Sequence, residues 1–406
     1  MWQDRVRAVG SSFWFIPAVC ATAAVVLAVV LVRIDDATDG DALPVLFPGG
    51  PSGARALLGS ITASMISFTG LVFSITIVVL QLTSSQFSPR ILRSFLQDRA
   101  SQAALGVFVA TFVYAMTVLR SVRGESTDAP FVPRIATTMS FVLVIASVAL
   151  FIYYIHHIAN MIRAATILAS VGGETRKLLA QRYPKDRQAL SAPLHPVRQT
   201  VCAPGPGVVT TLSAQPLTEL AAEADCVVEL IPAVGTFVPE GAPLFHVRRD
   251  GGRPAPDLDE KAVLSTVTFD IEPSMEQDVS YGFRQLTDVA ERVLSPSLND
   301  HTTAVQAIDQ IHDLLRRLAS CPMPERIEAD EDGVARVIEH EVGIDHYLDV
   351  GVDQIARWAD DSPRVLGRLR AMLADVETVA RPEHLAAIRR HDEHLARLEA
   401  SIAPDD

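Results

Sequence analysis

The sequence predicts a membrane α-helical fold with four transmembrane helices, followed by a cytoplasmic α+β region that contains a small β-module and C-terminal helices. Four long stretches without a charged side chain lie within the first 162 residues, and each is long enough to cross a bilayer. Residues 1–165 carry 11 basic and 8 acidic residues, which leaves 24 basic and 40 acidic residues of the chain's 35 and 48 for the remainder. This division indicates an apolar anchor and an acidic soluble half.

The four predicted spans are residues 13–32, 57–82, 100–119 and 135–155. A helix rises about 1.5 Å per residue, so 20 uncharged residues cover a hydrocarbon core of about 30 Å. A signal peptide is the alternative for the first span, but its apolar region is usually only about 7–15 residues long. Because the first span ends directly in Arg33 without a small-residue cleavage site, a retained anchor is favoured.

The basic residues that flank the spans predict their orientation. The N-terminus, the loop between the second and third spans and the segment after the fourth span are rich in arginine or lysine. The chain is therefore expected to cross the plasma (cytoplasmic) membrane with both termini on the cytoplasmic side. The third loop fits this orientation less well, because it contains Arg120, Arg123 and Arg134.

The second span is unusual because it carries two hydroxyl-rich faces. At 100° per residue, one polar face falls within roughly 100° of the helix surface, and a threonine face lies opposite. Two interpretations remain open: either this helix lies at the centre of a helix bundle, or its serine face lines a polar pathway in an oligomer. The candidate pore-lining or helix-packing residues are Ser60, Ser64, Ser67, Ser74, Gln81 and Ser85.

A short elbow follows the second span. Ser88 suits a helix N-cap and Pro89 the first helical position, so an amphipathic helix over about 89–98 is expected at the membrane interface. Such a helix is either a lever for gating or a static elbow. The juxtamembrane candidates are Gln86, Ser88, Pro89 and Arg90.

The predicted domains are 1–165 (transmembrane), 166–200 (helical linker), 201–272 (a β-rich module) and 273–406 (helical). Within the module, paired glycines around residues 236–240 favour a hairpin that looks like those of biotinyl and lipoyl carrier domains. Those carriers need an acceptor lysine. No lysine occurs between positions 185 and 261, which excludes a swinging-arm carrier.

The C-terminal region begins with two predicted helices joined by a polar elbow. Apolar residues at helical spacing define a helix over about 276–294, and a second helix follows the elbow. The elbow is either a capped helical hairpin, or a ligand or cation site or a contact between subunits. Its candidate residues are Arg284, Asp288, Asn299 and Asp300.

Sequence motifs do not indicate catalysis. His384, His391 and His394 lie along one helix within 347–402, but H-E-x-x-H is absent, the four cysteines are scattered, and no metal site is predicted. Nucleotide-binding and nucleophile-elbow motifs are also absent, so we expect neither an enzyme nor a cofactor. The acidic soluble half argues against a nucleic-acid partner.

Three blocks resemble an uncharacterised bacterial family of predicted membrane proteins, catalogued as a domain of unknown function (DUF2254). They are residues 80–90 (LQLTSSQFSPR), 277–286 (QDVSYGFRQL) and 290–300 (AERVLSPSLND). The resemblance covers nearly the whole chain and implies four spans and a soluble C-terminal region, but no activity or catalytic residue. His301 stands where the family is expected to place a proline.

These features favour an oligomeric channel or transporter, with the second span nearest the path and the cytoplasmic half as an assembly and regulatory domain. Its expected partners are the lipid bilayer, further copies of the chain and inorganic ions. The alternative is a membrane-anchored sensor or scaffold without conduction. A metal-dependent membrane enzyme is the weakest hypothesis.

Overall fold

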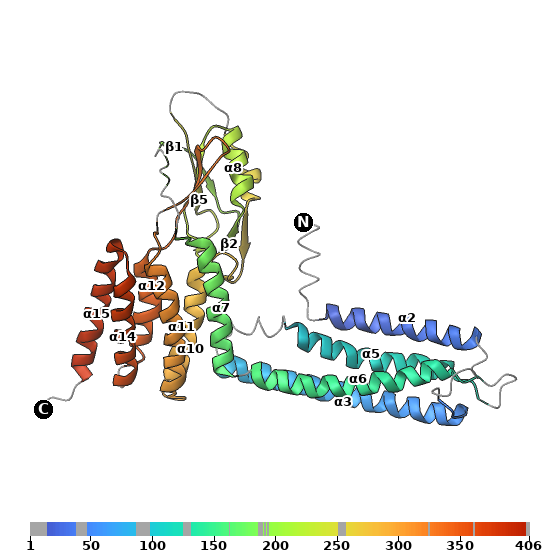
Figure 1. The fold of residues 1–406 in the computed structure, drawn as a ribbon. Coiled ribbons are helices and arrows are strands. Elements are labelled where there is room, and N and C mark those ends of the chain that lie inside the picture. The colour runs from blue at the N-terminus through green and yellow to red at the C-terminus, as the bar shows by residue number, and fades with distance from the viewer. Residues whose placement is uncertain are drawn as a thin grey trace. The chain divides into compact units, whose positions relative to one another are not determined.

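The computed structural model consists of two compact units, residues 1–163 and 164–406 (Figure 1). It describes residues 14–37, 47–86, 98–124, 131–161, 163–185, 190, 192, 195–250, 257–323, 325–359 and 362–402.

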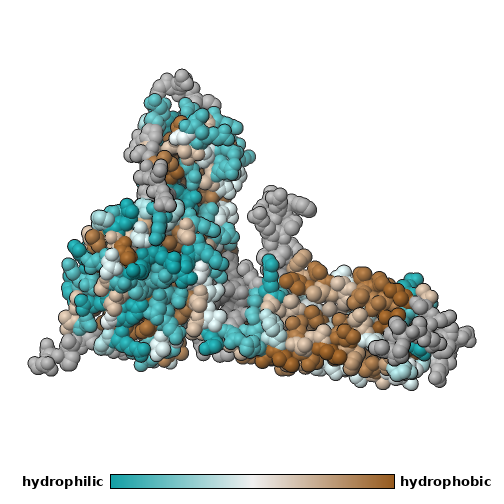
Figure 2. Space-filling view, viewed as in Figure 1, coloured by the Kyte–Doolittle hydropathy of each residue, from teal (hydrophilic) through white to brown (hydrophobic). Residues whose placement is uncertain are grey.

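In the described part of the first unit, four helices are long and apolar enough to cross a membrane, which confirms the predicted spans. Hydrophobic side chains cover much of its visible surface, whereas the visible surface of the second unit is largely hydrophilic (Figure 2). The helices are α2 (Phe15–Ala37), α3 (Pro51–Gln86), α5 (Arg99–Ser121) and α6 (Arg134–Met161).

Helix α5, rather than the second span α3, is the most enclosed of these four described helices. Half of the most apolar window of α5 is buried, against 17% for α2 and α3 and 22% for α6. Small residues allow this enclosure: a Cβ added at Gly106 would lie 2.9 Å from the sulfur of Cys20 on α2. The first interpretation of the second span placed it at the centre of the bundle, but in this unit α5 is more enclosed than α3.

Polar contacts fix the helices of the first unit. Thr111 of α5 bonds Ser147 of α6 at 3.0 Å. At one end of α6, the carboxylate of Asp35 accepts hydrogen bonds of 2.9 Å from the backbone N–H groups of Ile135 and Ala136. These N–H groups have no partner within their own helix, so the carboxylate caps α6.

The second unit begins with helix α7 (Ala164–Arg182), which packs against α10 and α11. The prediction of a linker over 166–200 is wrong for this helix, because Ile167, Leu168, Leu178 and Leu179 are buried in the unit. The helix is part of the core.

Two sheets follow α7. The five-stranded sheet has the order β1-β5-β3-β8-β7, and the three-stranded sheet has the order β4-β2-β6. Buried aliphatic side chains from both sheets, with helix α8, form one core. The strands are β1 (Val197–Cys202), β2 (Gly207–Leu212), β3 (Val227–Leu230), β4 (Phe237–Val238), β5 (Pro243–Arg248), β6 (Val267–Asp270), β7 (Arg326–Ala329) and β8 (Ala335–Glu339), and the short helices beside them are α8 (Ala214–Glu223) and α9 (Glu260–Leu264).

The predicted hairpin is corrected by this topology. β4 pairs with β2, whereas β5 pairs with β1 and β3, so the two segments around the glycines belong to different sheets. Gly235 and Gly241 have φ of 89° and 75°, which is the conformation that favours glycine. The glycines therefore mark turns between two sheets.

The sequence predicted a helical region over 273–406, but this region also contains two strands. Strand β8 pairs in parallel with β3, and β7 pairs with β8 around Gly333, whose φ is 78°. One sheet therefore joins residues from both sides of the domain boundary expected at 272.

The remaining helices form a bundle. Helix α10 confirms the helix expected over 276–294, and α11 packs against α10, α7 and α14. These elements are α10 (Val279–Leu294), α11 (His301–Ala319), α12 (Ile344–Leu348), the π-helical turn η2 (Asp349–Asp353), α13 (Gln354–Ala356), α14 (Pro363–Val379) and α15 (Pro382–Ile402).

Candidate functional site: the outward polar face of helix α3

Helix α3 packs into the first unit along one narrow stripe. Its buried residues recur at intervals of three, four or seven, which places them on a single side of the helix. They are Ala54, Leu58, Ile61, Met65, Val72 and Val79.

The predicted serine face lies on the other side of the same helix. Ser60, Ser67, Ser74 and Gln81 follow one another at intervals of seven residues, and each stands two residues after Leu58, Met65, Val72 or Val79. Two residues correspond to about 200° around a helix, so the polar seam is almost opposite the packed stripe. All four residues, and Ser64 beside them, are exposed. We call these five residues the polar seam.

The polar seam has few partners within its own unit. Ser67 Oγ donates to the carbonyl of Ala63 at 3.1 Å, a bond that stays within the helix. Among the residues that the structure describes, Ser60, Ser64, Ser74 and Gln81 have no side-chain hydrogen bond.

Small residues beside the polar seam have no packing role in the unit. A Cβ added at Gly59 or Gly70 would meet nothing within 4 Å among the described residues. Glycine usually costs about 0.5–1 kcal/mol relative to alanine inside a helix. Small residues on one helix face are typical of close helix–helix contact in lipid, so this face is suited to contact with another helix.

The threonine face behaves differently. Thr62, Thr69 and Thr76 are half-buried, and each donates to a carbonyl four residues earlier at 2.7–2.8 Å. Thr76 also bonds the hydroxyl of Tyr154 on α6 at 2.7 Å. This face therefore belongs to contacts inside the unit.

The predicted juxtamembrane elbow is only partly covered by the structure. Helix α3 continues through Ser85 to Gln86, whose side chains are not described, and Ser88, Pro89 and Arg90 lie outside the described residues.

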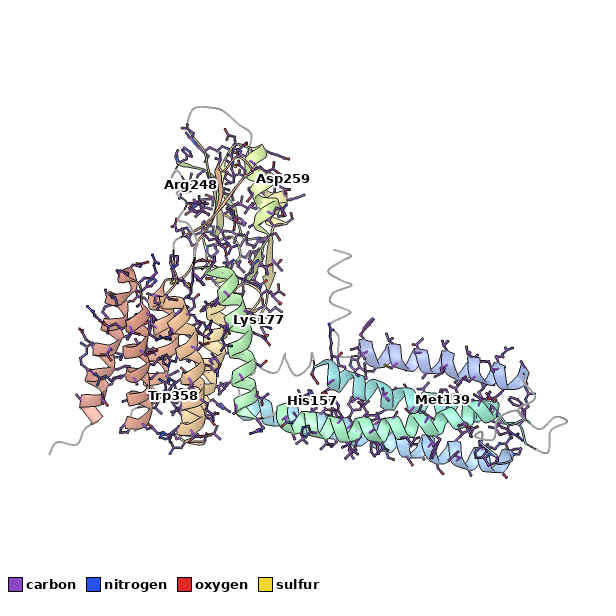
Figure 3. All side chains as sticks on the ribbon, viewed as in Figure 1. Met139, His157, Lys177, Arg248, Asp259 and Trp358 are labelled. Atoms are coloured by element: carbon purple, nitrogen blue, oxygen red, sulfur yellow. The ribbon has the colours of Figure 1, made fainter. Side chains whose placement is uncertain are left out.

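Asp98, the last residue of the predicted amphipathic segment, caps α5. Its carboxylate accepts a hydrogen bond of 2.8 Å from the backbone N–H of Ser101 and lies 3.1 Å from Nε2 of His157. His157 stands near the end of α6 (Figure 3).

The candidate residues of the polar elbow in the C-terminal region separate into two groups. Asp300 caps α11 by accepting hydrogen bonds from the backbone of Thr302 and Thr303 and from the hydroxyl of Thr303, which lowers the pKa of the Asp300 carboxyl. Asn299 has φ of 46°, and its side-chain oxygen lies 2.5 Å from Nε2 of His301. These contacts are those of a capped helical hairpin.

Arg284 and Asp288, the other two predicted elbow residues, are half-buried on α10. Arg284 donates to Asp278 at 2.7 Å, at the start of α10. It stands eleven residues before Ser295, which is roughly 16 Å along a helix, so it does not join Asn299 and Asp300. Burial raises the pKa of the Asp278 carboxyl.

A small cavity of about 20 Å³ lies beside Asp278. It is lined by residues that include Arg182, Tyr183, His340 and Tyr347, and the two tyrosine hydroxyls are 3.0 Å apart. Burial raises the pKa of Tyr347 well above its ordinary value. The volume corresponds to about one water molecule, so the cavity suits a bridging water.

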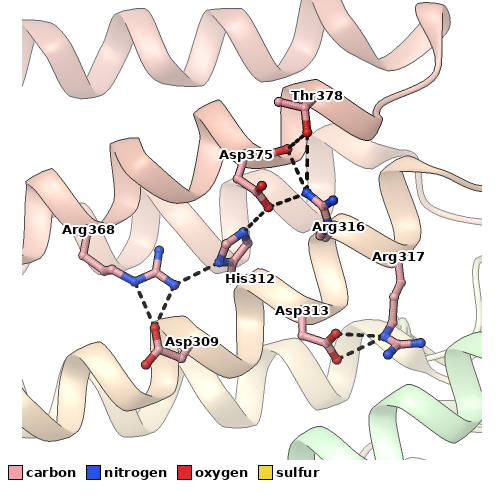
Figure 4. Close-up of polar contacts among 8 residues, drawn as sticks. All are labelled: Asp309, His312, Asp313, Arg316, Arg317, Arg368, Asp375 and Thr378. Atoms are coloured by element: carbon pink, nitrogen blue, oxygen red, sulfur yellow. Dashed lines mark hydrogen bonds and ion pairs between the residues drawn. The ribbon is translucent and has the colours of Figure 1, made fainter.

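A polar network that sequence patterns did not reveal joins α11 to α14 (Figure 4). His312 and Arg316 contact the carboxylate of Asp375 at 2.7 and 2.6 Å, and Arg368 contacts Asp309 at 2.7 Å. The hydrogen bond with His312 lowers the pKa of Asp375. Exposed ion pairs contribute only about 0–1 kcal/mol each, so this network mainly sets the register of the two helices.

The three histidines of α15 do not share a site as a set. His384 Nε2 lies 3.1 Å from the carbonyl oxygen of Cys321, whereas His391 Nδ1 lies 3.0 Å from Asp353. A different group has metal-binding geometry: donor atoms of Asp349, Asp353 and His391 all lie within 4.8 Å of one another. The four-residue spacing of the two aspartates is visible in the sequence, but the approach of α15 is not.

Comparisons with known proteins agree with the resemblance found in the sequence. Residues 10–375 match a family model described as "Predicted membrane protein (DUF2254)". The uncharacterized proteins Mb1321c of Mycobacterium bovis and Rv1290c of Mycobacterium tuberculosis are each 35% identical to this chain over 340 residues. These alignments cover 82% of this chain, which spans only 65% of the length of each relative. No solved structure matches the chain.

Proposed function

The chain belongs to the DUF2254 family of predicted membrane proteins, and we propose that it forms a homo-oligomer in which the polar seam of α3 faces other copies. In this assembly the seam lines a passage for small inorganic ions, and residues 164–406 are the cytoplasmic assembly and regulatory part. The basic flanks of the spans support a plasma-membrane location with both termini on the cytoplasmic side. The proposal involves no catalytic step.

The outward position of the polar seam is the observation that carries this proposal. A polar side chain without a hydrogen-bond partner is costly in hydrocarbon, and Gln81 carries an amide on the exposed side of a membrane-spanning helix. From Ser60 to Gln81 the chain advances by 21 helical steps, which is about 31 Å and matches the hydrocarbon thickness. Water or a second polar seam removes the cost along this whole length.

The seven-residue repeat supports helix–helix contact in particular. A heptad spacing keeps one seam facing a neighbouring helix that crosses at a small angle. The glycines beside the seam permit close approach of that neighbour. Copies of α3 arranged around a symmetry axis satisfy both features.

Disulfide cross-linking tests the assembly. In a background where Cys20, Cys202, Cys226 and Cys321 are replaced by alanine, we expect Ser67→Cys to form covalent dimers in membranes under a mild oxidant. The matched control is Ile145→Cys, which places a thiol on the exposed side of α6 and is expected to remain monomeric. Equal cross-linking at both positions, or a monomeric mass in detergent, contradicts the proposed interface.

Ion flux tests the passage. Purified protein in liposomes is expected to conduct Na⁺, K⁺ or Cl⁻, and Ser67→Leu is expected to reduce the flux while Ile145→Leu leaves it unchanged. An oligomer that gives no flux with any of the three ions contradicts the passage and leaves the oligomeric interface standing.

The alternative function is a membrane-anchored sensor or scaffold without conduction. It is favoured by one observation: residues 164–406 form a compact unit with their own core. Under this alternative, residues 164–406 expressed alone fold and bind a soluble partner, and the polar seam serves only for packing.

A further inference from the structure

The segment 344–356 contains a regular series of aspartates. Asp345, Asp349 and Asp353 recur every four residues along α12 and η2 and so lie on one side of the segment. The π-helical turn at 349–353 widens the helix between the last two carboxylates, and such turns occur frequently at functional sites.

Helix α15 brings an imidazole to this side. His391 is buried, its Nδ1 lies 3.0 Å from Oδ1 of Asp353, and its Nε2 lies 3.8 Å from Oδ1 of Asp345. Asp345 is also paired with Arg390. The carboxylate of Asp349 is different, because it forms neither a hydrogen bond nor an ion pair with any residue that the structure describes.

We propose that Asp349, Asp353 and His391 bind a divalent transition-metal ion such as Zn²⁺ or Mn²⁺. Their donor atoms lie within 4.8 Å of one another. Metal–ligand bonds of about 2.0–2.2 Å place two donors at most about 4.4 Å apart, so side-chain rotations that draw the donors closer together complete the site. Imidazole favours transition metals, whereas carboxylates also accept harder cations, and the mixed set indicates Zn²⁺ or Mn²⁺ rather than Ca²⁺.

The surroundings of His391 match those of a metal-bound histidine. A ligating imidazole usually directs its second nitrogen toward a carboxylate, which orients the ring. Asp345 stands on that side of His391, and Arg390 balances its charge. Three protein ligands leave the remaining coordination positions to water. Because Asp349 is exposed, the ion can exchange with solvent on that side of the site.

The bound ion would connect the segment 344–356 to α15. These two elements are about 40 residues apart in the chain, so an ion shared between them resists their separation. The site therefore stabilises the C-terminal bundle, and it does so whether or not the membrane helices conduct ions.

Metal titration of the full chain in detergent tests the site. After treatment with a chelator and its removal, calorimetry with Zn²⁺ and with Mn²⁺ is expected to show saturable binding of one ion per chain, and the ion is expected to raise the melting temperature. Asp349→Asn is expected to weaken binding by about tenfold or more. Because Asp349 is exposed and unpaired among the described residues, this variant should retain the fold without metal.

Glu393→Gln is the matched control. Glu393 is exposed on α15, two residues from His391, and its substitution removes the same charge without removing a proposed ligand. We expect the control to bind the ion as the unaltered chain does. The proposal is overturned if the unaltered chain shows no saturable binding, or if Asp349→Asn and Glu393→Gln change the affinity equally.

Discussion

Replacement of Gly282 by alanine tests how closely α7 and α10 approach each other. A Cβ added at Gly282 would lie 2.0 Å from Oγ1 and 2.8 Å from Cβ of Thr175 on α7. Thr175 is fully buried, and its hydroxyl donates to the carbonyl of Val171 at 2.7 Å, so the side chain has little freedom to move away. The added methyl group must therefore separate the two helices.

The magnitude follows from two opposing effects. Overpacking of a core costs about 1–3 kcal/mol. Alanine is better than glycine in a helix by about 0.5–1 kcal/mol. The net expectation is a loss of roughly 1–2 kcal/mol in the free energy of unfolding. For a unit of this size, about 2–4 °C per kcal/mol corresponds to a melting temperature lower by roughly 2–8 °C.

The assay is thermal melting of the full chain in detergent, followed by the fluorescence of Trp358 after Trp2 and Trp14 are replaced by phenylalanine. Gly367→Ala on α14 is the control, because a Cβ there meets nothing within 4 Å among the described residues. Only the helix-propensity gain remains at that position, and we expect a small rise in melting temperature. If Gly282→Ala also raises the melting temperature, the close packing of α7 on α10 is refuted.

Two further predictions concern carboxylates. Asp35→Asn is expected to lower the stability of the membrane unit by about 1 kcal/mol, because it weakens the cap on the backbone N–H groups of Ile135 and Ala136. The control is Asp36→Asn, which changes an exposed neighbour and should leave the melting temperature unchanged. Equal melting temperatures of the two variants would exclude the cap. Burial alone would raise the pKa of Glu229, but hydrogen bonds from Arg248 and His340 outweigh it and hold that pKa below its ordinary 4.5. Glu229 therefore contributes stability above pH 4.5 that is lost as the pH falls through its lowered pKa. In Glu229→Gln, the melting temperature should fall less steeply between pH 6 and pH 3 than in the unaltered chain. An equally steep fall in both proteins would contradict a stabilising role of the Glu229 carboxylate.

Local signals in the sequence were sufficient for several elements. Charge-free stretches of about 20 residues predicted the spans, because a helix that spans lipid must be apolar along its whole length. Asp300 was predicted as a cap, because an aspartate before an apolar helical pattern satisfies backbone N–H groups that are only two or three residues away.

Other features depend on residues that are far apart in the chain. The parallel pairing of β8 with β3 joins segments separated by more than 100 residues, and no local pattern encodes which strand a short apolar run will meet. The separation of Arg284 from the elbow, in contrast, is local: Arg284 lies in the second turn of α10 and bonds Asp278, six residues earlier.

Composition and helical periodicity were enough to predict four membrane spans, an acidic second half and a second span with two polar faces, because these patterns are local to the chain. Which of those faces is enclosed depends on how the helices pack. Leu58, Met65, Val72 and Val79 pack inward and carry the threonine face partly with them, so the serine face is left outside. Likewise, Asp349 and Asp353 were readable as a spacing of four, but only the packing of α15 places His391 against them.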